Sequence, residues 1–146
     1  MLDPEYDDNR EDIQSSLKRF EKMLAQEENS FFDLDTLEQI ADHYFIQSQF
    51  DEGLKACDLG LLHFPYTLEL IILKAQILGE LTRTEEAMEL IENSMILFPT
   101  DTDLKLVKGS LLSQLKQHEA AIDQFLQVLE SVEDKDEVYF RIGCVI

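Results

Sequence analysis

The sequence predicts an all-α fold, a solenoid of helical hairpins preceded by a capping helix. Three observations lead to this prediction: few helix breakers, apolar residues at helical spacing, and an internal period of 34 residues. Five glycines and three prolines in 146 residues favour long helices over a turn-rich β fold. The hydrophobic content of 45% excludes wholesale disorder, because a disordered chain lacks the apolar surface that offsets its conformational entropy.

Small residues recur along the chain in one register. One series is Ala41, Ala75, Gly109 and Gly143, and a second, twelve residues later, is Gly53, Ala87 and Ala121. Two antiparallel helices approach closely only where side chains are small, so each pair of small residues marks a helix crossing. Phe–Pro pairs close two of the units, at Pro65 and Pro99. Self-similarity at a fixed period of this kind is typical of a helical repeat array.

The first expected helix covers residues 12–28. Apolar residues lie at helical spacing at Ile13, Leu17, Phe20 and Leu24, and charged residues occupy the other face. We interpret this helix as a cap on the first repeat, because end repeats need a polar outer face. The alternative is an amphipathic helix that binds a partner.

Three helical pairs follow, expected at 34–47 with 51–63, 67–81 with 84–97, and 102–115 with 118–131. A last helix from residue 136 opens a fourth unit. Proline lacks an N–H and forces the preceding residue out of the α region, so Pro65 and Pro99 are expected to end the second helix of their pairs. Gly53 and Gly60 lie inside a helix at a cost of about 1 kcal/mol each relative to alanine, which indicates close packing.

This pattern resembles the tetratricopeptide repeat, a helix–turn–helix unit of 34 residues. The resemblance covers residues 34–146. It rests on Leu37, Ile40, Ala41, Tyr44, Phe50, Gly53 and Pro65 in the first repeat, on Ile71, Ala75, Leu78, Ala87 and Pro99 in the second, on Gly109, Leu112, Ala121 and Phe125 in the third, and on Tyr139, Ile142 and Gly143 in a fourth. Lys74, Lys105, Lys108 and Glu133 depart from the family pattern.

The resemblance implies a right-handed α-solenoid with two parts. Residues 1–33 form an acidic N-terminal segment with the capping helix, and residues 34–146 form the repeat domain. The repeats are expected at 34–67, 68–101 and 102–135, with a partial fourth at 136–146. Because that unit has no second helix, we expect an N-terminal fragment of a longer repeat chain. Its apolar helix would then self-associate or bury itself in a neighbour, through Tyr139, Phe140, Ile142 and Ile146.

The chain carries a formal charge of -19, from 31 acidic and 12 basic residues. This sign disfavours binding to nucleic acid and to anionic membranes, both of which require Lys and Arg. Solubility explains the charge, and attraction of basic partners is the alternative. The N-terminus has neither the basic start nor the apolar run of a signal peptide. With two cysteines in all, we expect a cytoplasmic protein with reduced thiols.

Residues that carry chemistry do not cluster in the sequence. His43, His63 and His118 are far apart and lack a second ligand at metal-binding spacing. Cys57 falls on a packed helix face, where an inert thiol is expected, and Cys144 is expected near solvent. The sequence contains no Gly-rich phosphate loop, nucleophile elbow or HExxH motif. We therefore expect no catalytic residues, no metal and no cofactor; an acidic metal enzyme is the disfavoured alternative.

Binding is the remaining function. The resemblance implies that the first helix of each repeat lines a concave face that binds a peptide or protein segment. The residues expected there are Asp35, Glu38, Asp42, Phe45, Ile46, Glu69, Ile72, Gln76, Glu80, Asp103, Leu106, Ser110, Ser113, Gln114, Glu137 and Phe140. Acidic edges and an apolar floor would suit a partner with basic and large apolar residues. The lysines, arginines and asparagines with which some family members bind acidic chaperone tails are missing here.

Three alternatives stay open beside this hypothesis. The expected concave residues are equally well explained as solvated helix positions. The repeats could act as a structural spacer or a self-association module of a larger protein whose activity lies downstream. An acidic mimic of nucleic acid is a further alternative, which net charge supports only weakly.

Overall fold

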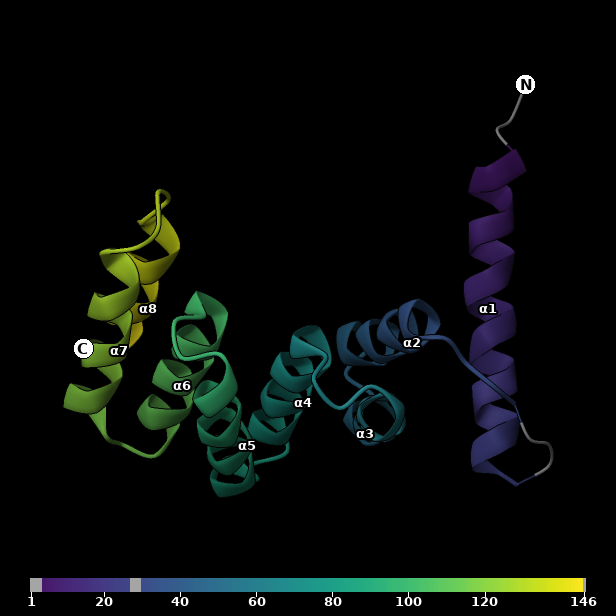
Figure 1. The fold of residues 1–146 in the computed structure, drawn as a ribbon, viewed down its shortest axis with the longest axis horizontal. Coiled ribbons are helices and arrows are strands. Elements are labelled where there is room, and N and C mark those ends of the chain that lie inside the picture. Colours follow the sequence, from purple (N-terminus) through teal and green to yellow (C-terminus); the bar gives the residue numbers. More distant parts are fainter. Residues whose placement is uncertain (1–3, 27–29, 146) are drawn as a thin grey trace. The chain divides into compact units, whose positions relative to one another are not determined.

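The computed structural model describes residues 4–26 and 30–145, with side chains described from Ile13 onward. These ranges form eight α-helices and no strand (Figure 1), so the all-α prediction is confirmed. The helices are α1 Pro4–Leu24, α2 Leu34–Ile46, α3 Phe50–His63, α4 Leu68–Glu80, α5 Thr84–Leu97, α6 Thr102–Gln114, α7 His118–Leu129 and α8 Asp136–Val145. The chain divides into two compact units, residues 1–70 and 71–146, which we describe separately.

The prediction for the first helix was wrong at its start, and it ends before residue 28, although residues 27 and 28 lie outside the described residues; the other seven helices begin and end within two residues of expectation. α1 begins at Pro4 instead of residue 12 because proline is well suited to the first helical position, where its missing N–H has no partner to lose. It ends at Leu24 because Gln26 adopts a left-handed backbone conformation with a φ of 61°.

In the first unit, α1 packs against α2 as the expected cap. The ring of Phe20 is fully buried, 5.9 Å from the ring of Phe32 and 6.0 Å from that of Tyr44. The Arg19 guanidinium lies 4.6 Å from the centre of the Phe32 ring. Burial, with a smaller contribution from the nearby Glu21 carboxylate, raises the pKa of Tyr44 to about 12. An aromatic cluster therefore joins the cap to the first repeat.

The small residues of both units lie at close contacts. A Cβ atom added to Gly60 would overlap the Leu70 side chain. One added to Gly109 would lie 2.5 Å from Phe125 Cε1. The expected close packing at these two positions is confirmed. For Gly143 it was wrong, because no described atom lies within 4 Å of an added Cβ on that face of α8.

The two Phe–Pro pairs end their helices as expected. α3 ends one residue before Phe64, and α5 ends one residue before Phe98. Both phenylalanines leave the α region, with φ and ψ of -132° and 70° at Phe64 and -128° and 65° at Phe98. The proline that follows each of them accounts for this conformation.

The turn inside each hairpin uses a left-handed residue that the sequence did not predict. Ser48, Thr82 and Lys116 have φ values of 57°, 59° and 64° and recur every 34 residues. The next N–H donates to the carbonyl five residues before it in each case: Gln49 to Tyr44 at 2.8 Å, Arg83 to Leu78 at 2.8 Å, and Gln117 to Leu112 at 2.9 Å. This is the Schellman closure of a helix end. Glycine usually occupies such a position, and none of these three residues is glycine.

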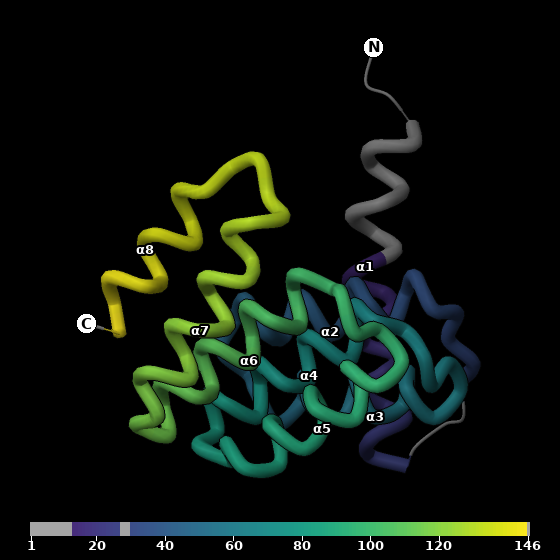
Figure 2. Tube along the Cα trace, turned by 60° about the vertical axis from the view of Figure 1, so that its left-hand side comes forward, coloured from purple at the N-terminus to yellow at the C-terminus, as the bar shows by residue number. Residues whose placement is uncertain are grey.

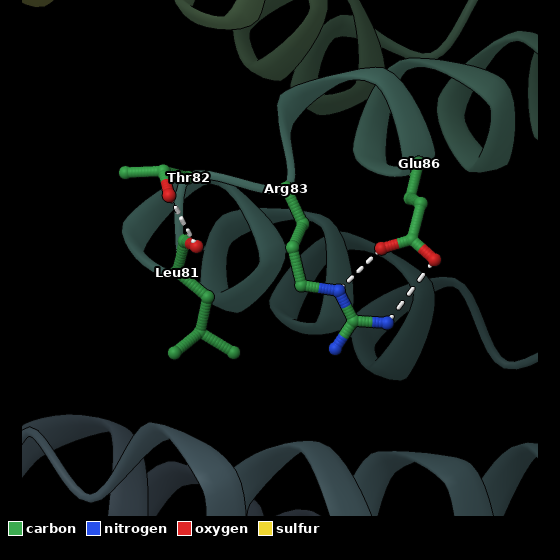
Figure 3. A network of polar contacts seen from close by, with 4 residues as sticks. All are labelled: Leu81, Thr82, Arg83 and Glu86. Carbon is green, nitrogen blue, oxygen red and sulfur yellow. Dashed lines mark hydrogen bonds and ion pairs between the residues drawn. The ribbon is translucent and has the colours of Figure 1, made fainter.

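Figure 3 shows the turn of the second unit, between α4 and α5. The Thr82 hydroxyl donates to the Leu81 carbonyl at 2.6 Å, and the Arg83 guanidinium pairs with the Glu86 carboxylate. This ion pair lowers the pKa of Glu86, chiefly through the hydrogen bond from Arg83. Both groups are solvent-exposed, so the pair stabilises the turn only slightly.

One buried cluster of the second unit lies where α6, α7 and α8 meet, and Figure 2 traces these helices one after the other. The buried cluster consists of Leu112, Ala121, Phe125, Val128 and Val138. Ile142 and Val145 of α8 pack against this cluster and are half-buried. Ile142, which was expected among the residues for self-association, therefore contributes to packing within the unit, and the self-association stays a prediction. Tyr139 and Phe140 are exposed by 60% and 72%, and Ile146 lies outside the described residues.

Candidate partner-binding surfaces

The first unit carries a row of carboxylates, which we call the acidic strip: Asp35, Glu38, Asp42 and Glu69. The three on α2 share one face because residues three and four apart on a helix are neighbours. Burial raises the pKa of Glu38, and the nearby charges of Glu69, Asp35 and Asp42 raise it further. Burial also raises the pKa of Asp42. Glu69 at the start of α4 thus lies close enough to extend the strip beyond α2.

Apolar side chains continue this face at the C-terminal end of α2. Phe45 is half-buried, with its ring 6.0 Å from that of Phe50 on α3. Ile46 is 75% exposed. The first unit therefore presents four carboxylates followed by an exposed apolar group.

The second unit contains a cleft of about 460 Å³, which we call the α6–α8 cleft. This volume lies within the roughly 300–1,000 Å³ range of pockets that bind small ligands. The residues that line it are Ser110 and Ser113 of α6, Phe125 of α7, and Glu137, Phe140, Arg141, Cys144 and Val145 of α8. Phe125 is buried in the core, whereas Phe140 is largely exposed. The cleft therefore combines an apolar lining with a few polar groups from two helices.

Arg141 links the two helices across this cleft. Its Nη1 donates to Ser110 Oγ at 2.8 Å, a contact between residues 31 apart in the sequence. Its Nη2 and Nε donate to Glu137 Oε1 at 3.0 and 3.3 Å. The Arg141 side chain is 31% exposed, so the guanidinium still reaches solvent. α8 is thereby tied to α6 by a polar bridge in addition to its apolar packing.

The structure divides the expected concave residues among separate places. Asp35, Glu38, Asp42 and Glu69 form the acidic strip, with Phe45 beside it on α2. Ser110, Ser113, Glu137 and Phe140 line the α6–α8 cleft. Ile72 and Gln76 are half-buried, while Glu80 and Asp103 are exposed, and none of these four lines the cleft. Leu106, expected on the concave face, is half-buried and packs against the cluster formed by α6, α7 and α8.

Sequence reasoning missed four residues of the cleft: Phe125, Arg141, Cys144 and Val145. Glu137 and Arg141 are four residues apart, which predicts an ion pair on one helix face. The spacing contains no sign of the contact between Arg141 and Ser110, because it depends on how α8 packs on α6.

The described residues offer little that indicates metal chemistry or a membrane span. No three of their histidine, cysteine, aspartate and glutamate side chains are grouped so as to hold a metal ion. None of the described helices combines the length and the apolar character needed to cross a bilayer. Cys57 is buried and Cys144 is exposed, as expected for each.

One repeat of the chain matches a known protein family. Residues 102–132, which contain α6 and α7, match the tetratricopeptide-repeat family model. Residues 102–132 therefore form a tetratricopeptide repeat. None of the curated protein sequences compared with this chain matches it.

Solved structures share the fold of this chain. The NMR structure of the first TPR domain of human RPAP3 has a TM-score of 0.71 at 20% identity, covering 77% of this chain and 88% of that one. The first TPR of Spaghetti (RPAP3), bound to the HSP90 peptide SRMEEVD, has a TM-score of 0.69 at 20% identity, covering 77% and 89%. A crystal structure of MamA has a TM-score of 0.74 at 13% identity, covering 99% and 84%. These similarities show a shared helical-repeat fold.

Proposed function

We propose that this chain is a non-enzymatic protein-interaction module that binds a peptide or protein segment of a partner. The observation that carries the proposal is the α6–α8 cleft, because its two serines, its arginine and its exposed phenylalanine converge from different helices. Convergent polar groups in an apolar cleft are typical of binding sites. The HSP90 peptide bound by the TPR domain of Spaghetti (RPAP3) supports peptide binding by this fold.

The partner that fits this chain carries basic and large apolar residues. The acidic strip attracts Lys or Arg. Burial is the main cause of the raised pKa of Glu38, and the neighbouring carboxylates add a repulsion that a bound cation would reduce. The net charge of -19 steers basic partners toward the chain over a longer range. An acidic peptide like the one bound to Spaghetti (RPAP3) would meet repulsion at the strip.

A self-association or spacer role is the second candidate. The observation that favours it is the pair of exposed aromatic residues on α8, Tyr139 and Phe140. The net charge opposes it, since two copies of an acidic chain repel each other. Light scattering of the purified chain at increasing concentration separates the two: a concentration-dependent rise in mass supports self-association.

The test of partner binding is selection from a random peptide library on the purified chain. We expect enriched peptides to contain Lys or Arg beside large apolar residues, and their binding to weaken with salt. The double variant Glu38→Lys, Asp42→Lys should lose the basic preference. A matched control, Glu119→Lys with Asp123→Lys, changes the charge equally at exposed sites on α7 and should keep it. Selection that enriches no peptide on the wild-type chain would refute the proposal.

A further inference from the structure

The Arg141 side chain has donors left over inside the α6–α8 cleft. A guanidinium carries five N–H groups. Among the described residues, the bond to Ser110 uses one and the two bonds to Glu137 use two more. Two N–H groups thus remain for an acceptor that enters the cleft. The same three bonds hold the guanidinium in place, so little side-chain entropy is lost when an acceptor binds.

The charge of the cleft selects which acceptor can enter. Arg141 and Glu137 neutralise each other, with 3.0 Å between Nη2 and Oε1. An entering carboxylate would lie next to the Glu137 carboxylate, on a chain whose net charge is already -19. Like charges at this range repel. A neutral carbonyl accepts the same hydrogen bonds without that repulsion.

The apolar lining selects the side chain that accompanies the carbonyl. Phe140 is 72% exposed, and Val145 is half-buried. Phe125 lies behind them, anchored in the core of the unit. A large apolar side chain would remove the Phe140 ring from water, and the burial of this apolar surface stabilises the complex.

We propose that the α6–α8 cleft binds an uncharged residue with a large apolar side chain, and that Glu137 makes the cleft reject carboxylates. The main-chain carbonyl of that residue accepts hydrogen bonds from Arg141. Glu137 is thus a specificity-determining residue, because it neutralises Arg141. This inference rests on the proposed function and specifies the apolar part of its ligand.

A pair of small probes tests it on the whole 146-residue chain. N-acetyl-phenylalanine amide presents an apolar ring and neutral carbonyls, and N-acetyl-phenylalanine differs only in ending as a carboxylate. NMR titration should show the amide shifting the backbone signals of Ser110, Ser113 and residues 137–145. We expect the carboxylate to bind roughly fivefold more weakly, the effect of about 1 kcal/mol of screened repulsion.

Three variants separate the contributions. Glu137→Gln should remove the discrimination, so that the carboxylate binds at least as tightly as the amide. Phe140→Ala should abolish binding of both probes. Tyr139→Ala is the matched control, because Tyr139 is an exposed aromatic residue of the same helix that does not line the cleft. It should leave both affinities unchanged.

Equal affinities of the two probes for the wild-type chain would overturn the inference, and so would shifts confined to signals outside the cleft. A Glu137→Gln variant that keeps its circular dichroism spectrum and still binds the amide more tightly than the carboxylate would overturn it as well. If Glu137→Gln unfolds α8, the affinities of the two probes for the wild-type chain and for Phe140→Ala still test the inference. A chain that enriches library peptides but fails with these probes keeps the proposed function and loses this inference. A chain that enriches no peptide loses the proposed function whatever the probes do.

Discussion

α2 and α6 occupy equivalent places in the repeat, yet α2 carries most of the acidic strip whereas α6 contributes Ser110 and Ser113 to the α6–α8 cleft. Asp35, Glu38 and Asp42 of α2 correspond, 68 residues later, to Asp103, Leu106 and Ser110 of α6. The buried neighbours stay alike: Ala41 and Gly109 are both small and fully packed. Packing restricts the buried positions, whereas the exposed positions between them vary. One backbone can therefore present a carboxylate row in one unit and an apolar cleft in the other.

The largest expected effect comes from removing the ring shared by the core and the cleft. Phe125→Ala should lower the free energy of unfolding by about 3–5 kcal/mol, because it deletes a buried aromatic residue and leaves a cavity. Chemical denaturation followed by circular dichroism measures the loss. Phe20→Ala is the counterpart in the first unit and should leave the NMR signals of the cleft in place. Equal disturbance of the cleft by both variants would contradict the separate description of the two units.

Glycine substitutions on α6 and α8 sharpen the comparison within the second unit. Gly109→Ala should cost about 1–3 kcal/mol, because its Cβ would lie 2.5 Å from the Phe125 ring and force the core apart. Gly143→Ala should stabilise the chain by roughly 1 kcal/mol, since alanine favours a helix and open space surrounds that position. Thermal unfolding of the two variants should give shifts of opposite sign. Shifts of the same sign would show that one of the two packing descriptions is wrong.

The left-handed turn residues are common to both units. Thr82→Gly should stabilise the chain by about 1 kcal/mol, because a β-branched residue is strained at a φ of 59° and glycine is not. Thr82→Ala is the control: it removes the same hydroxyl but keeps a Cβ, so it should bring no comparable gain. Denaturant midpoints of the two variants provide the measurement. An equal gain from alanine would show that the hydroxyl, and not the backbone conformation, causes the strain.

The smallest expected effect concerns the pH dependence of the acidic strip. The pKa of Glu38 is raised in the folded chain, so between the unfolded and the folded pKa values the folded state binds more protons than the unfolded state. The free energy of unfolding therefore falls as the pH rises through that window. Glu38→Gln should therefore be more stable than the wild type above the window, and the difference should vanish below the unfolded pKa. Denaturation at a series of pH values tests this. Asp103→Asn, which removes one exposed carboxylate of the second unit, controls for net charge, and an identical pH profile for it would refute the role of the strip.

Local patterns in the sequence predicted the helices and their repeat. Proline and glycine destabilise a helix where they occur, and the spacing of apolar residues defines one face of a helix within a few turns. Pro65 and Pro99 ended their helices as expected, since the conformational restriction before proline is local. The left-handed turns escaped prediction because Ser48, Thr82 and Lys116 carry no signal for that conformation. The closing hydrogen bonds and the packing of the hairpin impose it.

The sequence alone determined the fold class, the period, the close contacts at Gly60 and Gly109 and the acidic character of the strip. Only the tertiary structure decided that Leu106 and Ile142 are half-buried against the core and that Arg141 contacts Ser110. Periodicity tells which residues share a face of one helix. A bond across 31 residues depends on how α8 docks on α6 and α7, which is set by the packing of side chains such as Val138 and Phe125.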